Sequence, residues 1–289
     1  MKRLILACVV TLVASAAATV AAVDYLRGRD VATDRFTPRT FESTVLDERR
    51  ELLVHLPESY HRAPDRRFDV VYVLDGSSLD GPTAEGAAMM ARLALTPEVI
   101  VVGLPNVSGA GRQRDYTPPF MRQDLDTADS ALGRGDRFLD FLEQELVPLV
   151  ERDYRTTGRR ILSGHSRGGL LVVYALMARP ALFDGYLAHS PALWRNDEAL
   201  VASMATWLAA RASLDRFLYL SIGSEEVPRM MAGFDHLRDV LAQRAAAAGL
   251  RWHADVVAGA DHQANGTWAS PLGLRAYFDA RRPDSATAR

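Results

Sequence analysis

The sequence predicts an α/β fold with a mainly parallel central sheet, helices on both of its faces and an N-terminal antiparallel hairpin. Three observations support this. Short β-branched runs alternate with longer amphipathic stretches, and several runs are apolar at almost every position, as strands covered on both faces are. The chain has 289 residues, 48% of them hydrophobic, which is enough for one large core. Alternation of this length favours right-handed crossovers in a doubly wound sheet.

The predicted strands begin with a hairpin of residues 41–46 and 51–56, joined by the polar turn 47–49. The next two runs, 69–74 and 99–104, are nearly continuous in apolar residues and read as buried parallel strands. The remaining strands are predicted at residues 160–163, 185–188, 217–222 and 250–257.

The predicted helices are residues 137–154, 198–211, 228–248 and 271–280. The first has apolar residues at three- and four-residue spacing. Gly249 fits the C-cap of the third helix. Ser270 and Pro271 fit the N-cap and first turn of the last one.

The N-terminus predicts export. Lys2 and Arg3 precede an apolar run, 4–13, and a small-residue stretch, 14–18, so residues 1–23 read as a signal peptide. An uncleaved membrane anchor through residues 4–23 is the alternative. The expected location is periplasmic or secreted. Residues 24–38 are expected to be a linker, 39–282 a single α/β domain and 283–289 a tail.

Composition excludes several classes of protein. A formal net charge of -2 gives no basic excess to attract nucleic acid, and membrane contact is expected only if the N-terminal segment is uncleaved. Cys8 is the one cysteine, so a cleaved chain would have no disulfide and no thiolate chemistry. No metal-ligand motif stands out, and we predict neither a metal nor another cofactor.

The strongest motif is Gly-His-Ser-Arg-Gly at residues 164–168, which fits G-x-S-x-G. It follows a strand-like run and opens a helical stretch, 169–177, as the nucleophile turn of the α/β-hydrolase fold does. Glycines on both sides allow the close packing that such a strained turn requires. Ser166 is therefore the candidate nucleophile, the alternative being a serine that merely caps a helix.

The base is expected on a loop after the last strand, because the order in this fold is Ser, then Asp or Glu, then His. His262 is the histidine left by that rule, since the earlier ones precede the late strands. His236 falls inside a predicted helix and His253 inside the last predicted strand.

The acid should follow the preceding strand, where Glu225 and Glu226 are adjacent. Only one of them can orient the imidazole, and Glu226 is preferred, with Glu225 as the alternative. Asp261 and Asp255 are weaker options.

An oxyanion hole needs two backbone donors. One should be the N–H of Arg167, at the positive end of the helix after the nucleophile. The other should come from the loop that holds Gly76 and Ser77.

With these pieces in order, the chain resembles the putative-esterase family of α/β hydrolases. That group includes enterochelin-type siderophore esterases, esterase D-like enzymes, feruloyl esterases and mycolyltransferases. The matching segments are residues 54–60, 72–76, 114–118, 164–169, 190–194, 223–226 and 261–262. Many relatives have Asp where Glu226 stands.

The resemblance implies Ser166 as nucleophile, His262 as base and Glu226 as acid, with backbone donors at Ser77 and Arg167. It also implies a substrate pocket formed by Gly76, Arg114, Tyr116, His165 and Trp194.

The predicted function is hydrolysis of a small-molecule carboxylic ester through an acyl-enzyme. Acyl transfer by the same residues is one alternative, and a catalytically inactive binding protein of the same fold is another. A siderophore trilactone, a feruloyl ester and a short-chain ester all fit. Arg112, Arg114 and Arg122 could face an anionic substrate, although the Arg-rich composition favours a solvated surface for them.

Overall fold

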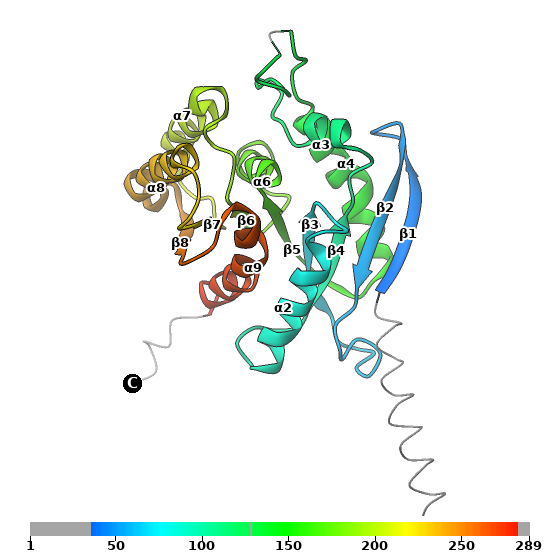
Figure 1. Ribbon diagram of the computed structural model, residues 1–289. Coiled ribbons are helices and arrows are strands. Elements are labelled where there is room, and N and C mark those ends of the chain that lie inside the picture. Colours follow the sequence, from blue (N-terminus) through cyan, green and yellow to red (C-terminus); the bar gives the residue numbers. More distant parts are fainter. Residues whose placement is uncertain (1–35, 128, 283–289) are drawn as a thin grey trace, which may run out of the picture. The chain divides into compact units, whose positions relative to one another are not determined.

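In the computed structural model, which describes residues 36–127 and 129–282, the strands form one eight-stranded sheet (Figure 1). Its order is β1-β2-β4-β3-β5-β6-β7-β8. Strands β3 to β8 pair in parallel, and β2 pairs antiparallel with β4. The bounds are β1 (Phe36–Ser43), β2 (Glu48–His55), β3 (Phe68–Leu74), β4 (Val99–Leu104), β5 (Thr156–His165), β6 (Gly185–His189), β7 (Arg216–Gly223) and β8 (Leu250–Val257). The mainly parallel α/β sheet predicted from sequence is confirmed.

Helices cover both faces of this sheet. Their bounds are α2 (Asp80–Arg92), α3 (Gly109–Asp115), α4 (Gly135–Phe141), the π-helical turn η2 (Leu142–Leu146), α5 (Val147–Asp153), α6 (Arg167–Ala178), α7 (Arg195–Ala209), α8 (Pro228–Ala248) and α9 (His262–Asp279). Gly249 ends α8 with φ 74°, the left-handed conformation expected of a glycine C-cap.

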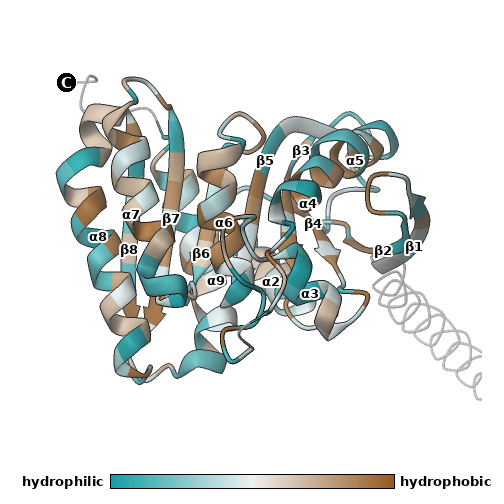
Figure 2. Cartoon of the chain, turned by 90° about the horizontal axis from the view of Figure 1, so that it is seen from above, coloured by the Kyte–Doolittle hydropathy of each residue, from teal (hydrophilic) through white to brown (hydrophobic). Residues whose placement is uncertain are grey.

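The pleat of the strands separates two hydrophobic cores. Val71 and Val73 of β3 face α2 and α9, whereas Val70 and Tyr72 belong to the larger core beneath α4 to α8. In Figure 2 the strands are largely hydrophobic, and hydrophilic positions lie on the surrounding helices. Because both faces are covered, the parallel strands are apolar along most of their length.

The predicted boundaries of the N-terminal hairpin are wrong. The hairpin turn lies at residues 44–47, not 47–49, and β2 begins at Glu48. The turn is held from outside the hairpin, because Glu145 Oε1 accepts hydrogen bonds from the N–H groups of Thr44 at 2.8 Å and Val45 at 3.0 Å. A contact to a residue so far along the chain is not visible in the local pattern.

The last helix begins much earlier than predicted. Helix α9 starts at His262, and Asp261 caps it by accepting a hydrogen bond from the Ala264 N–H at 2.8 Å. Ser270 and Pro271, predicted to begin the helix, lie inside it. Helices α2 and α3 were not predicted at all.

The expected signal peptide or anchor, residues 1–23, and the tail, 283–289, lie outside the described residues, as does most of the expected linker; β1 begins at Phe36. Among residues 36–127 and 129–282, no helix combines the length and apolar character that a membrane span requires.

Candidate active site

Ser166 lies in the sharp bend between β5 and α6, beyond the carboxyl end of the sheet. Its backbone has φ 59° and ψ -114°, a conformation that costs energy in a residue with a side chain. Neighbouring segments hold the bend, since the Ser166 N–H donates to His189 O at 2.9 Å and the Ala192 N–H donates to Ser166 O at 3.0 Å. A Cβ on Gly164 would lie 2.7 Å from the backbone of Gly168, so this crossing requires glycine.

A continuous hydrogen-bonded chain links Ser166, His262 and Glu226. Ser166 Oγ lies 3.0 Å from His262 Nε2, and His262 Nδ1 lies 2.8 Å from Glu226 Oε2. His262 is the first residue of α9 and is partly exposed, whereas the Glu226 side chain is fully buried. In this order of groups, a proton can pass from the hydroxyl to the imidazole while the carboxylate fixes the tautomer.

The second carboxylate oxygen of Glu226 is also occupied. Ser190 Oγ donates to Glu226 Oε1, and the Gly223 N–H approaches the same oxygen at 3.4 Å. Burial disfavours the charged form, but the hydrogen bonds from His262 and Ser190 outweigh it and hold the pKa of Glu226 below its usual value. Glu226 is therefore an ionised acceptor at neutral pH.

Ser190 is itself positioned by a buried amide. Asn265 Nδ2 of α9 donates to Ser190 Oγ at 2.8 Å and to Ser221 Oγ at 3.1 Å. Asn265 is fully buried, so the network connects the ends of β6 and β7 to the helix that carries His262. The sequence assigned no role to either Ser190 or Asn265, although Ser190 lies just beyond the predicted strand 185–188.

The other candidate acids lie in different surroundings. Glu225 is exposed and makes no hydrogen bond to His262. Asp261 caps α9, and Asp255 accepts a hydrogen bond from the Tyr219 hydroxyl at 2.7 Å. Of the four carboxylates considered from sequence, the structure brings only Glu226 to the imidazole.

His165, predicted to line the substrate pocket, packs against the ring of His262 and hydrogen-bonds to its backbone. Its Nε2–H donates to the backbone carbonyl of His262 at 2.6 Å, and the ring centroids are 4.6 Å apart. Burial, together with the nearby imidazole of His262, lowers the pKa of His165 to about 4. His165 is thus neutral at physiological pH and adds no competing charge.

The two predicted oxyanion donors, Arg167 and Ser77, differ in the partners of their backbone N–H groups. Among the described residues, the Arg167 N–H has no protein acceptor, as is usual in the first turn of a helix. The Ser77 N–H instead donates to Asp80 Oδ1 at 2.8 Å, because this buried carboxylate at the start of α2 needs donors. Ser77 could serve an oxyanion only after releasing Asp80.

Two predicted pocket residues are structural. The Gly76 backbone approaches β4 and not an open site, since a Cβ there would lie 2.4 Å from the Leu104 nitrogen. Tyr116 is fully buried, with Phe138 packed edge-on at 5.4 Å between ring centroids. Its hydroxyl accepts a hydrogen bond from the Asp75 N–H at 3.1 Å, so Tyr116 shapes the loop after β3 from within the core.

Arg114 is also not free for a ligand. Its guanidinium pairs with Glu48 at 3.1 Å and with Asp115 at 2.7 Å, joining β2 to α3. Trp194, by contrast, is partly exposed and follows the loop that contacts Ser166 through Ala192. The guanidinium of Arg229 lies over its ring, 4.2 Å from the centroid.

One group beside the nucleophile turn was missed. Asp75 accepts two hydrogen bonds from Arg112, at 2.6 and 2.8 Å, and one from Asn106 Nδ2 at 2.6 Å. A Cβ on Gly168 would lie 3.3 Å from Asp75 Oδ2, which places this carboxylate against the start of α6. From sequence, the loop of Gly76 and Ser77 was expected to supply a backbone donor, and the neighbouring Asp75 carboxylate was given no role.

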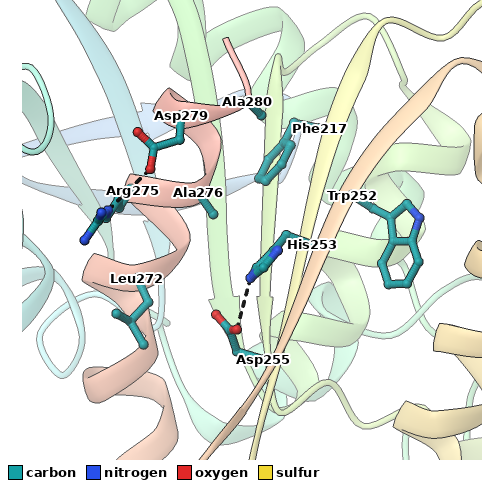
Figure 3. A pocket seen from close by; sticks show the side chains of 9 residues that line it. All are labelled: Phe217, Trp252, His253, Asp255, Leu272, Arg275, Ala276, Asp279 and Ala280. Atoms are coloured by element: carbon teal, nitrogen blue, oxygen red, sulfur yellow. Dashed lines mark hydrogen bonds and ion pairs between the residues drawn. The ribbon is translucent and has the colours of Figure 1, made fainter. Parts of the chain in front are cut away.

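A separate pocket of about 400 Å³ lies between β8 and α9 (Figure 3). Its wall includes Trp252, His253 and Arg275, and it contains none of the three residues of the hydrogen-bonded chain. Within residues 36–127 and 129–282, no three His, Asp or Glu side chains gather as metal ligands would.

A family model described as putative esterase matches residues 43–272, which is most of the chain. The chain belongs to this esterase family. Its sequence is 32% identical over 184 residues to the siderophore enterobactin esterase of Emericella nidulans, covering 57% of this chain and 60% of that protein. It is 29% identical over 163 residues to the ferri-bacillibactin esterase BesA of Bacillus subtilis, covering 52% and 56%. The alignments thus span little more than half the length of these curated relatives.

Among solved structures, an IroE-like serine hydrolase from Shewanella oneidensis is similar to this esterase-family chain, with a TM-score of 0.77 and 28% identity. The match covers 84% of this chain and 80% of that one. The α/β-hydrolase fold predicted from sequence is therefore confirmed.

Proposed function

We propose that the protein is a serine carboxylic-ester hydrolase in which Ser166 is the nucleophile, His262 the base and Glu226 the acid. The observation that carries the proposal is the unbroken chain of hydrogen bonds, 3.0 Å from Ser166 to His262 and 2.8 Å from His262 to Glu226. Both distances are within the range needed for proton transfer. Membership of the esterase family supports the same reading.

In the first half-reaction, Ser166 Oγ attacks the ester carbonyl carbon as its proton moves to His262 Nε2. The Arg167 N–H, at the positive end of α6, donates to the developing oxyanion. When the tetrahedral intermediate collapses, the bond to the alcohol oxygen breaks. That oxygen takes the proton from His262, and the acyl group stays on Ser166.

In the second half-reaction, water attacks the acyl carbon and gives a proton to His262. The Ser166 oxygen then leaves and recovers that proton, and the carboxylic acid is released. Glu226 accepts the Nδ1–H throughout, which keeps Nε2 facing the serine and stabilises the imidazolium.

The proposed substrate class is a siderophore-type or other small ester. The names of the two curated relatives support this class, because one is a siderophore enterobactin esterase and the other a ferri-bacillibactin esterase. Transfer of the acyl group to an alcohol acceptor would use the same residues and remains the alternative activity. A binding-only role is disfavoured, since the hydrogen-bonded chain is complete.

We further propose that the protein is exported to the periplasm or secreted, or held at the membrane through residues 4–23 if that segment is uncleaved. The sequence of the first residues supports this. A nucleic-acid partner is not expected at a net charge of -2.

The test is an ester panel assayed with the purified protein and with Ser166→Ala. The panel contains a siderophore trilactone, a feruloyl ester and a short-chain ester. We expect turnover of at least one ester and a fall of about 10³-fold or more in the variant. Full turnover by the variant would exclude Ser166 as the nucleophile. Product analysis with added acceptor alcohol separates hydrolysis from acyl transfer.

A further inference from the structure

Two arginines are buried in the described part of the chain, and they differ in their ion-pair partners. Arg50 is 2% exposed and pairs with the carboxylates of Glu48 and Asp115. Arg195 is 6% exposed, yet no carboxylate among the described residues pairs with it. Buried charges are normally paired, because removing an ion from water is costly. Arg195 is therefore a buried cation that no carboxylate of the described residues pairs with directly.

The contacts of Arg195 are weak substitutes for one. Its Nη2 donates to the backbone carbonyls of Arg122 at 2.9 Å and Gln123 at 3.0 Å, and its Nε is buried without a partner. A neutral carbonyl offers a partial charge where a carboxylate or phosphate would offer a full one.

A second guanidinium meets the first at the same oxygen. Arg167 Nη1 donates to Gln123 O at 2.8 Å and to Thr117 Oγ1 at 2.8 Å. Two like charges thus converge on one carbonyl, and burial together with Arg195 lowers the pKa of Arg167 to about 10. Arg167 nevertheless stays protonated at neutral pH, so both cations persist.

Asp124 and Asp126 attract Arg195 through space, and Asp124 also attracts Arg167, but neither carboxylate forms an ion pair with these arginines. Asp124 follows Gln123 in sequence, but its oxygens accept from the Asp126 N–H and the Thr127 hydroxyl, and from neither arginine. Within the described residues, Nε and Nη2 of Arg167 have no protein partner. Donors thus remain available on the partly exposed member of the pair.

Both arginines belong to segments that contact the nucleophile. Arg167 directly follows Ser166, and Arg195 begins α7 at the end of the loop whose Ala192 N–H donates to Ser166 O. The positive end of α6 points to the same region. Both arginines are therefore attached to backbone segments that adjoin the reacting serine.

We propose that Arg167 and Arg195 form a subsite for an anionic group of the substrate, separate from the oxyanion hole. The preferred substrate is then an ester that carries a carboxylate or comparable anionic oxygen group. The inference rests on the proposed esterase function and specifies its substrate class. The guanidinium fork suits such a group because it can offer two parallel N–H donors. The bound anion would supply the direct ion pair that the protein does not.

The experiment compares esters that differ in one charge. In one pair, 4-acetoxybenzoate and 4-acetoxybenzamide, the anionic or neutral group is on the alcohol side of the ester. In the other, monomethyl terephthalate and methyl 4-carbamoylbenzoate, it is on the acyl side. Each kcat/KM is divided by the rate of that ester with hydroxide, which removes differences in intrinsic reactivity.

For the wild type we expect a preference of about tenfold or more for the anionic ester in at least one pair. Arg167→Gln should bring the ratio of the two kcat/KM values close to one, because the neutral ester has no anionic group to lose a contact. Arg122→Gln is the matched control, because Arg122 is exposed in the same loop and, among the described residues, its guanidinium hydrogen-bonds only to Ser130 O. It should retain the preference.

Equal use of both members of each pair by the wild type would overturn the subsite, as would an Arg167→Gln variant that slows both members equally. Neither result touches the esterase proposal, which fails only if Ser166→Ala retains turnover. Should Arg167→Gln not fold, the wild type still decides. Benzoate must then inhibit hydrolysis of a neutral ester more strongly than benzamide does, and the difference must shrink in 1 M salt.

Discussion

The Ser190 hydroxyl donates a hydrogen bond to Glu226 Oε1, the carboxylate oxygen that His262 does not contact. The acid is thus held on both sides, by a residue at the end of β6 and by the base itself. Glu226 has no contact with solvent through its side chain, so each hydrogen bond to it has few substitutes.

Replacing Ser190 by Ala leaves Glu226 Oε1 short of a donor. We expect the free energy of unfolding to fall by about 1–3 kcal/mol, the usual cost of an unsatisfied buried polar group. Urea denaturation measures it. In the Glu226→Gln background, Ser190→Ala should lower the free energy of unfolding by a smaller amount, because the hydroxyl no longer donates to a charged carboxylate. If the losses of the two single variants simply add in the double variant, the two residues are not coupled and the prediction fails.

The two adjacent glutamates should differ sharply in catalysis. Glu226→Gln removes the anionic acceptor of the His262 Nδ1–H and should lower kcat by about 10²- to 10⁴-fold. Glu225→Gln is the matched control, since Glu225 is exposed and does not contact His262. Its kcat should stay within about twofold of wild type. Comparable losses in both variants would mean that the acid is misassigned.

Stability should decline on mild acidification because two histidines are buried in the neutral form. Burial, with the charge of His262 assisting, lowers the pKa of His165 to about 4, and burial lowers that of His189 to about 3. Between these values and the unfolded value of 6.5, the unfolded chain binds more protons, so folding weakens as pH falls.

Each of these histidines should lower the free energy of unfolding at pH 5 by about 2 kcal/mol relative to pH 7.5. Urea midpoints at the two pH values measure the sum. In His189→Gln the difference between the two pH values should shrink by about that amount, whatever the variant's stability at pH 7.5. An unchanged difference would show that His189 is not the titrating group.

The nucleophile bend should not tolerate a methyl group. In Gly164→Ala the new Cβ would lie 2.7 Å from the Gly168 backbone, so β5 and α6 would have to move apart. We expect a loss of about 2 kcal/mol or more in stability. Gly81→Ala in α2 is the control, because its Cβ meets nothing within 4 Å and should change stability by less than about 1 kcal/mol. Thermal unfolding distinguishes the two.

Much of the candidate site was predictable because its signals are local. Ser166 stands in a five-residue motif between a strand and a helix, and His262 follows the last strand. Parallel strands bring such loops to one edge of the sheet, so their order in the chain places them together. The structure shows the resulting 3.0 Å contact.

The rest depended on contacts between distant segments. The local pattern favoured neither Glu225 nor Glu226 decisively, because what distinguishes them is Ser190, from another strand. The sequence does not distinguish Tyr116 as a core residue from Tyr116 as a pocket residue, because the contact that buries it comes from Phe138, in a later helix. The first half of α9 was missed because Gly266 is a poor helix former. The structure shows why a glycine fits there, since the His165 ring packs against it.

The central claim is that Ser166 is activated by His262, and covalent labelling tests it most directly. A fluorophosphonate probe reacts with an activated serine hydroxyl, and peptide mass spectrometry locates the adduct. We predict a single adduct on Ser166, formed much more slowly in His262→Gln and absent in Ser166→Ala. Labelling that persists in Ser166→Ala, or that proceeds at the wild-type rate without the imidazole, would contradict the account.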